Sequence, residues 1–174
     1  MANIAATLGA KLGKALPENM RNTLGIRAFG FFKIPLLFFV SPSVRELSDE
    51  RCVVSIPLNR RTRNHLKSMY FGTLACGADC AGGLIAVRMI EREGANVSLV
   101  FKDFKADFLK RPESTVFFTC EDGKAIQELV RKTIASGERE NLSVRVTATC
   151  PDKSGAEPVA EFVLTLSLKR RDPK

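Results

Sequence analysis

The chain contains 174 residues, 45% of them hydrophobic, which is typical of one globular domain and excludes a disordered or disulfide-dependent chain. Five cysteines without paired spacing, and no recognisable signal peptide, predict a reducing, cytoplasmic setting. The net charge of +8 is compatible with a nucleic acid, an anionic membrane surface, a phosphate-bearing ligand or a solvated basic surface. We expect no nucleic acid, because the chain has no tryptophan, one tyrosine and no known binding motif.

Residues 1–40 predict a helical extension that precedes the main domain. Apolar residues recur at helical spacing at Ile4, Leu8, Leu12 and Leu16. Pro17 ends this first piece, and a second helix is predicted from about Glu18 to Phe29.

Residues 31–40 are strongly apolar, with the sequence Phe-Phe-Lys-Ile-Pro-Leu-Leu-Phe-Phe-Val. A bilayer span needs about 20 residues, so we expect no transmembrane segment here. We expect the stretch to pack over the core or to close an apolar ligand pocket, because so many large apolar side chains would otherwise form one exposed patch. A weak membrane contact is the alternative.

Residues 41–174 are expected to form the main domain. Residues 44–46 and 52–56 predict a hairpin that turns at Ser48 to Glu50, and a basic loop over residues 58–67 follows.

Residues 68–93 predict one long buried helix, ended by Gly94. Its first half is rich in glycine, alanine and cysteine, and interior glycines cost roughly 1 kcal/mol each, which indicates close backbone approach. Asp79 is the one carboxylate in this apolar run, and burying a lone carboxylate is costly unless it is paired or solvated. Cys76 and Cys80 share a helix face, but only His65 is available as an imidazole ligand, so we expect packed thiols and no metal site.

The remaining chain predicts strands around one further helix. Strands are expected over residues 97–109, 115–120, 142–148 and 159–168, with an amphipathic helix over residues 124–135. The apolar phase changes within residues 97–109, which predicts a β-bulge. The whole pattern is typical of an α+β fold in which an antiparallel sheet wraps around the central helix.

The order of elements and the central segment resemble the hotdog fold, over about Val44 to Lys169. The resemblance is closest to the thioesterase branch related to the phenylacetate-pathway thioesterases, and within it to an uncharacterised conserved group. That branch has an Asn, a Gly three residues later, His-Gly-Gly, and an acidic residue seven positions after the second Gly. Asn64, Gly72 and Asp79 match this pattern, and residues 107–112 look like the end of the family's second long strand.

Three positions depart from the motif. Lys67 replaces the glycine, Tyr70 replaces the histidine and Phe71 replaces the first Gly of the pair. In the family, the amide at that first Gly position holds the thioester oxygen, and Phe71 still supplies a backbone N–H. The resemblance further implies a homodimer or a dimer of dimers with active sites between subunits.

The resemblance implies an acyl-CoA thioesterase that uses no separate cofactor, coenzyme A being part of the substrate. The amides of Phe71 and Gly72 would polarise the thioester carbonyl, Asp79 would act as base or nucleophile, and Asn64 would orient water or the carbonyl. The predicted substrate-binding residues are Tyr70, Thr73, Ser68, Phe108, Lys110 and Arg111, with Ser68 also the expected helix N-cap.

Three questions stay open. The protein is either a hydrolase or a non-catalytic binder of an acyl-CoA or lipid, and Asp79 is either catalytic or paired with Arg88, Asn64 or a partner subunit. For Asn64, the alternative is a cap within its own loop.

Overall fold

The computed structural model describes residues 16–171, so the helix expected over residues 4–16 lies almost wholly outside the described part. In chain order the elements are α2 (Glu18–Lys33), α3 (Pro35–Val40), β1 (Ser43–Leu47), β2 (Cys52–Ile56), α4 (Phe71–Arg92), β3 (Val97–Phe108), β4 (Val116–Cys120), α5 (Gly123–Ser136), β5 (Arg139–Thr149), α6 (Pro151–Ser154) and β6 (Pro158–Arg170). The predicted hairpin, the central helix, the later strands and the amphipathic helix over residues 124–135 are all confirmed.

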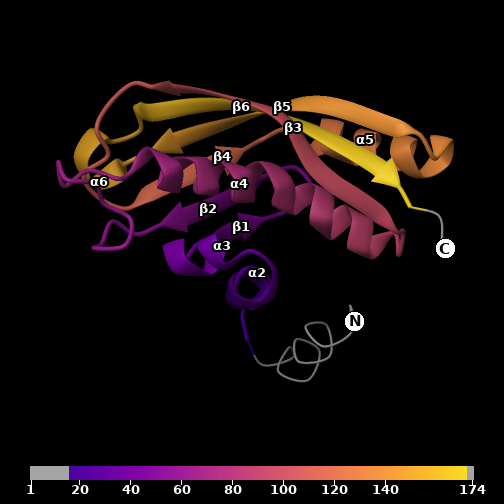
Figure 1. Ribbon diagram of the computed structural model, residues 1–174, viewed down its shortest axis with the longest axis horizontal. Coiled ribbons are helices and arrows are strands. Elements are labelled where there is room, and N and C mark those ends of the chain that lie inside the picture. The colour runs from indigo at the N-terminus through magenta and orange to yellow at the C-terminus, as the bar shows by residue number, and fades with distance from the viewer. Residues whose placement is uncertain (1–15, 172–174) are drawn as a thin grey trace.

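The six strands form one antiparallel sheet in the order β1-β2-β4-β5-β6-β3, which curves around α4 (Figure 1). Alternate residues of β4 and β5 point toward the helix and are buried, as the period of two requires. The core lies between α4 and this concave face, and α5 adds a second buried apolar stripe. The predicted α+β architecture is therefore confirmed.

The glycines of α4 bring the helix backbone against the sheet. A β-carbon at Gly77 would lie 2.3 Å from the Phe118 ring, and one at Gly82 would lie 3.4 Å from Val144. Any larger residue at Gly77 would push the helix away from the Phe118 ring, so the expected close approach is confirmed there. Within residues 16–171, α4 alone is long and apolar enough to cross a membrane, and 67% of its most apolar window is buried inside the fold.

β3 forms one edge of the sheet and pairs only with β6. The register shifts between Phe101 and Phe104, which confirms the predicted β-bulge. Large apolar side chains along or just beyond this edge are about half exposed, namely Val100, Phe104, Phe108 and Leu109. A long apolar edge strand is a template for pairing with another strand.

β1 forms the other edge, and α2 covers it. The Val44 N–H donates to Thr23 Oγ1 at 2.9 Å, and the Arg27 guanidinium donates to the Pro42 carbonyl at 3.0 Å. The Asn19 side chain also donates to the Arg45 carbonyl. These contacts use backbone groups that a free strand edge would leave to solvent or to another chain.

The expectation that residues 31–40 bury their apolar side chains is wrong for the described chain. Only Leu37 and Val40 of this stretch are buried. The exposed fractions of the others are Phe31 59%, Phe32 71%, Ile34 42%, Leu36 57%, Phe38 44% and Phe39 49%. α2 continues to Lys33, and Pro35 then begins the new helix α3, because proline fits the first helical position. The inner side of α2 packs on β1, whereas α3 packs on α2 and α4, and the outer sides of both helices are not covered by residues 16–171.

Candidate active site at the N-terminus of helix α4

A tight loop over residues 57–70 sets the start of α4. The Asn64 Oδ1 atom accepts hydrogen bonds from the backbone N–H groups of Leu66 and Ser68, at 2.9 and 3.2 Å. The Asn64 amide also donates to Ser68 Oγ at 3.1 Å. Asn64 is thus a cap within its own loop, which is the alternative that the sequence left open, and it fixes the chain that leads into the helix.

Lys67 has a left-handed backbone conformation, with φ of 65°. In the motif of the thioesterase branch that the sequence resembles, this position is glycine. The motif's glycine thus corresponds to a position with positive φ, which in this chain is occupied by a lysine. A β-carbon in this region is sterically unfavourable. The loop therefore keeps the motif's geometry although it lacks the motif's residue.

Thr62 is a residue of the loop that the sequence analysis missed. Its buried hydroxyl donates to the Pro57 carbonyl at 2.7 Å and accepts from the Asn59 N–H at 2.9 Å. Its carbonyl accepts the Tyr70 N–H at 2.8 Å. The Asn-x-x-Thr spacing after a proline was the only signal for this turn.

α4 begins at Phe71, three residues later than expected, and Ser68 is not its N-cap. The Ser68 and Thr73 side chains are both buried; Ser68 bonds to Asn64, and the Thr73 hydroxyl lies 3.5 Å from the Thr62 carbonyl. Neither hydroxyl faces an open site in the single chain. The helix is capped at Tyr70 without a side-chain hydrogen bond.

The N–H groups of Phe71 and Gly72 have no acceptor among residues 16–171, whereas the N–H of Thr73 already bonds to the Tyr70 carbonyl. Free N–H groups at the first turn of a helix, together with the helix dipole, favour a negatively charged oxygen. The helix start is thus a preformed site for an oxyanion.

Aromatic rings surround this helix start. The Tyr70 and Phe71 ring centroids lie 4.7 Å apart, and those of Phe71 and Phe108 lie 6.5 Å apart. All three side chains are about half exposed. A β-carbon at Gly72 would lie 2.6 Å from the Tyr70 ring, so the glycine is needed for this ring to rest on the helix. The motif's second glycine therefore has a packing reason here.

Asp79 lies two turns after Gly72 on the same side of the helix. Burial raises the pKa of the Asp79 carboxyl to about 6, from its ordinary value of 3.8. Among residues 16–171 no group forms an ion pair or a hydrogen bond with this carboxylate. Arg88 instead forms an ion pair with Glu18 at 3.2 Å and donates to the Leu47 carbonyl, so the predicted pairing of Asp79 with Arg88 or Asn64 is wrong within this chain.

The two thiols beside Asp79 are buried. Burial, with the Asp79 charge as a smaller cause, raises the pKa of Cys76 and raises the pKa of Cys80 well above its ordinary value. A thiol in this state is a poor nucleophile at neutral pH. The carboxylate is therefore the candidate reactive group of this helix face, and we find no cluster of three or more potential metal ligands in residues 16–171.

Lys110 and Arg111, two of the predicted substrate-binding residues, lie at the same end of the molecule as the start of α4. The Met69 N–H donates to the Pro112 carbonyl at 2.8 Å, which ties residues 109–112 to the start of α4. Lys110 forms an ion pair with Glu157, and this contact lowers the pKa of the Glu157 carboxyl. Arg111 is exposed. The structure thus brings Lys110 and Arg111 near the aromatic rings and the free N–H groups.

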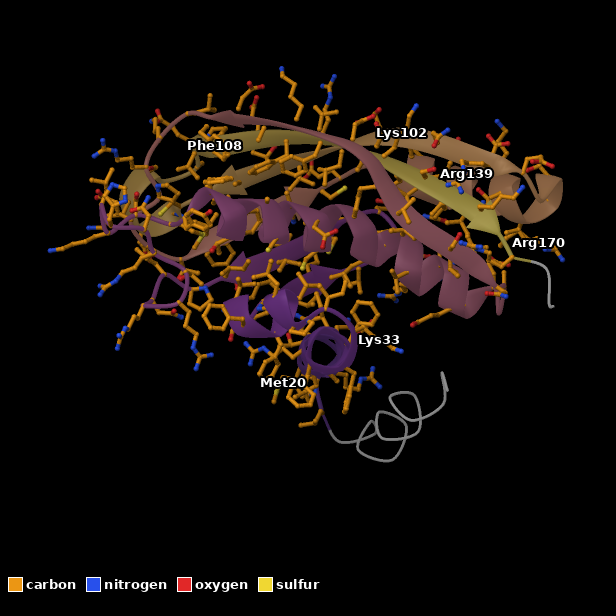
Figure 2. All side chains as sticks on the ribbon, viewed as in Figure 1. Met20, Lys33, Lys102, Phe108, Arg139 and Arg170 are labelled. Carbon is orange, nitrogen blue, oxygen red and sulfur yellow. The ribbon has the colours of Figure 1, made fainter. Side chains whose placement is uncertain are left out.

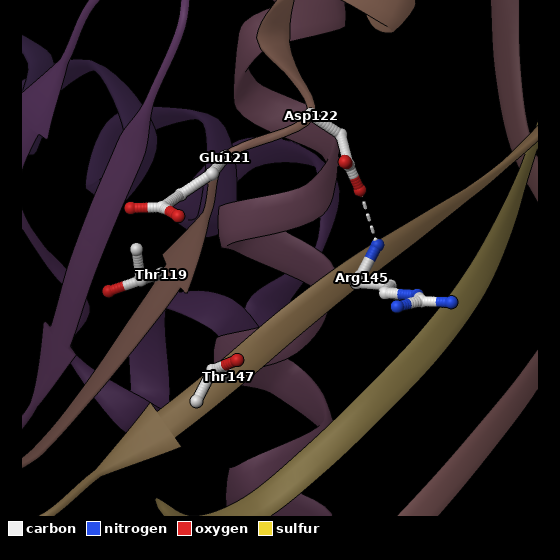
Figure 3. A pocket seen from close by; sticks show the side chains of 5 residues that line it. All are labelled: Thr119, Glu121, Asp122, Arg145 and Thr147. Carbon is white, nitrogen blue, oxygen red and sulfur yellow. Dashed lines mark hydrogen bonds between the residues drawn. The ribbon is translucent and has the colours of Figure 1, made fainter.

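The outer face of the sheet has a separate shallow depression of about 420 Å³, lined by Thr119, Glu121, Asp122, Arg145 and Thr147 (Figure 3). The Arg145 N–H donates to Asp122 Oδ2 at 2.7 Å. Thr119 alternates along β4 with the buried Phe118, which faces the helix, so the depression lies on the opposite face from Asp79. Its floor has no exposed nucleophile or unpaired buried group, and we assign it no role.

Comparisons with known proteins agree with this geometry. Residues 25–168 match the model of a family described as a domain of unknown function, DUF4442, and the match begins inside α2. None of the curated proteins matches the sequence significantly. Among solved structures, a protein of unknown function from Chlorobaculum tepidum is similar with a TM-score of 0.75 and 11% identity, over 88% of this chain and 97% of the other.

Two further structures carry descriptions of activity. A Pseudomonas aeruginosa protein described as a probable thioesterase has a TM-score of 0.70 and 19% identity, over 90% of this chain and 97% of its own. A thioesterase from Haemophilus influenzae has a TM-score of 0.63 and 13% identity, over 85% and 90%. The TM-scores show a shared fold, the thioesterase-like hotdog, at identities of 11–19%. The family match covers most of the chain, so this protein belongs to the DUF4442 family and has the hotdog fold.

Proposed function

We propose that the protein hydrolyses an acyl-CoA or similar thioester at the N-terminus of α4. One observation carries the proposal: two N–H groups without an acceptor and an unpaired, partly buried carboxylate lie on the same side of one helix. The thioester oxygen would accept from Phe71 and Gly72 as it gains charge. A helix rises about 1.5 Å per residue, which puts Asp79 about 10 Å from the N–H groups of its own chain. The Asp79 of a second copy of the chain would therefore remove a proton from water, whose oxygen attacks the carbonyl carbon. The carbon–sulfur bond then breaks, and coenzyme A leaves as a thiol after taking up a proton.

The surroundings suit the two halves of such a substrate. The rings of Tyr70, Phe71 and Phe108 supply an apolar wall for an acyl chain. Lys110 and Arg111 supply positive charge for the phosphates of coenzyme A. Five free cysteines, all buried, support the cytoplasmic setting in which acyl-CoA esters occur.

The site is proposed to be completed by a second copy of the chain. Gly83, one turn after Asp79, faces the Phe101 ring of β3, so the Asp79 side of α4 is the side of the open sheet edge. Pairing two β3 edges around a two-fold axis would cover the apolar edge and would bring a partner helix toward Asp79. A homodimer, or a dimer of such dimers, follows.

The test is a screen of acyl-CoA esters of increasing chain length, with free coenzyme A separated by chromatography so that the five protein thiols do not interfere. We expect turnover above the rate without enzyme for at least one chain length. The matched control is Cys80→Ser, which changes a buried neighbour of Asp79 without removing its charge and should keep activity. Absence of turnover on every ester would refute the proposal.

A second candidate, binding of an acyl-CoA or lipid without hydrolysis, has its own support. The Tyr70 ring lies against Gly72, and the Asn64 oxygen that would orient water is already used by its loop. This candidate predicts stoichiometric binding by calorimetry with no release of coenzyme A.

A further inference from the structure

We propose that the outward side of α2 and α3 docks on the surface of an anionic phospholipid bilayer. This surface, called here the α2–α3 face, consists of large apolar side chains that are 42–71% exposed: Met20, Leu24, Phe29, Phe31, Phe32, Ile34, Leu36, Phe38 and Phe39. Contiguous apolar surface of this kind marks an interaction site. The inference does not depend on the hydrolysis proposed above.

The orientation of the face is fixed by the other side of α2. Thr23 and Arg27 hold the β1 edge through their hydrogen bonds, whereas Met20 and Leu24, one turn apart, point away from the sheet. Figure 2 shows Met20 on the side of α2 that is remote from the sheet. α2 therefore cannot bury this face without giving up the edge that it covers.

The middle of the face is an aromatic cluster that joins the two helices. The Phe31 ring contacts the rings of Phe32 and Phe38 edge to face, with centroids 5.1 and 5.2 Å apart. The rings are preordered by these contacts, so little conformational freedom is lost when they enter an apolar phase. Exposed phenylalanine and leucine side chains are typical of surfaces that enter a membrane interface.

Charge identifies the partner as anionic. Residues 17–40 contain one acidic and three basic side chains, of which Arg27 is turned to the β1 edge. The adjoining residues 59–67 contain four basic side chains and none that are acidic. The Arg61 guanidinium lies 5.7 Å from the centre of the Phe39 ring, so the basic loop borders the apolar face. The one carboxylate, Glu18, is paired with Arg88 at 3.2 Å.

This combination favours a bilayer over a protein. A second copy would bring two positively charged rims together, which opposes self-association. A protein interface carries about one hydrogen bond per 100–200 Å², whereas the cluster of Phe31, Phe32 and Phe38 in the middle of this face has no side-chain hydrogen-bonding group. Apolar side chains with a basic rim match the acyl region and the phosphates of an anionic lipid surface.

The experiment is co-sedimentation of the full chain with two kinds of vesicle, one of phosphatidylcholine alone and one in which about a third of the lipid is phosphatidylglycerol. We expect strong binding to the anionic vesicles, weaker binding to the neutral ones, and weakening by salt. The double variant Phe31→Ser/Phe32→Ser should bind about tenfold more weakly or worse, because two exposed rings no longer enter the lipid.

Matched controls test whether vesicle binding depends on the α2–α3 face or only on the overall positive charge and exposed apolar surface of the protein. Arg61→Glu should bind about fivefold more weakly or worse, whereas Arg131→Glu, the same change on the exposed side of α5, should bind within about twofold of the native chain. Val163→Ser removes a half-exposed apolar residue from β6 and should also bind normally. Thermal melts of each variant check that the fold is retained.

Several outcomes would overturn the proposal. The native chain staying in solution with both vesicles is one, and equal binding by the double variant is another. If the native chain binds neither vesicle and the double variant has a lower melting temperature than the native chain, residues 1–15 cover the face. A smaller sedimentation mass of that variant would mean that a second copy covers it.

Discussion

β1 and β3 form the two edges of the same sheet, and within residues 16–171 only β1 is covered. At β1, the Thr23 hydroxyl and the Arg27 guanidinium use backbone groups of the strand and the segment before it. At β3, a strand of 12 residues has β6 on one side and no strand on the other. Large apolar side chains are exposed at both edges, namely Met20, Leu24 and Phe29 of α2 and Val100, Phe104 and Phe108 of β3.

The difference shows that exposed apolar surface has two separate origins in this fold. On the β1 side it remains because α2 holds the edge through Thr23 and Arg27 and leaves Met20, Leu24 and Phe29 exposed. On the β3 side it remains because no strand of residues 16–171 pairs with the outer edge of β3. The α2–α3 face has no unpaired strand N–H and C=O groups, whereas the β3 edge has them. We therefore expect a lipid surface at the α2–α3 face and a second copy of the chain at the β3 edge.

The largest expected effect is that of Asp79→Asn, on the open side. Hydrolysis should fall about 100-fold to 10,000-fold, because the general base is lost. Since burial raises the pKa of Asp79 to about 6, kcat/KM of the native enzyme should also fall as pH is lowered through about 6. Unchanged turnover in the variant would remove Asp79 from the mechanism.

The same substitution should stabilise the fold. The raised pKa means that the folded state binds the proton more tightly than the unfolded state, so stability falls as pH rises from about 4 to 6 and stays level above. At pH above 7, Asp79→Asn should therefore raise the free energy of unfolding by about 1–3 kcal/mol, and below pH 4 this gain should vanish. Denaturant titrations across pH measure it. A loss of stability would instead indicate a charged partner from a second subunit.

The next effect concerns the open edge itself. The native protein should sediment at twice 19.2 kDa, 38.4 kDa, and Val100→Asp should raise the dimer dissociation constant about 100-fold or more, because each carboxylate would be buried without a partner. Arg45→Asp, on the covered β1 edge, should leave the mass unchanged. A change of mass with Arg45→Asp alone would reverse the assignment of the two edges.

A smaller effect is expected at the covered edge. Thr23→Val keeps the side-chain shape but leaves the Val44 N–H without its acceptor, so stability should fall by about 1–2 kcal/mol. Thr119→Val, on the outer face of β4, removes a hydroxyl without a hydrogen bond in the described part and should change stability by less than about 0.5 kcal/mol. Equal losses in the two variants would show that the Thr23 contact does not hold α2 on the strand.

The smallest effect is a gain in the loop before α4. Lys67→Gly should stabilise the protein by roughly 0.5–1 kcal/mol, because glycine adopts a positive φ without steric cost. Arg63→Gly, in the same loop at an ordinary φ, should destabilise it. Thermal melts of the two variants give opposite shifts if backbone conformation is the cause.

Sequence patterns predicted the elements of the fold because each pattern is local. The phase change in residues 97–109 placed the bulge between Phe101 and Phe104, and the glycines of the central helix predicted a close contact that Gly77 makes with Phe118. The start of α4 was set three residues too early, since the Ser68 hydroxyl bonds to Asn64 and not to the helix.

The site was predicted less completely, because its properties depend on tertiary neighbours. Asp79 was identified from its position among small residues, but its lack of a partner followed only once Arg88 was found with Glu18. Likewise, the apolarity of residues 31–40 predicted burial, and no local pattern showed that α2 and α3 would cover an edge and expose their rings. Gly72 was identified by motif, and its contact with the Tyr70 ring became visible only in three dimensions.

The strand order has a consequence for synthesis on the ribosome. β3 ends at Phe108, and its only neighbour, β6, ends at Arg170, so 62 residues must be added before the pair can close. At about 5–20 residues per second, this leaves β3 without its neighbour for roughly 3–12 seconds. During that interval α4 lacks part of the sheet that will enclose it, and its apolar side chains are accessible to chaperones. The nascent chain, and not the finished fold, is therefore the state most prone to aggregation.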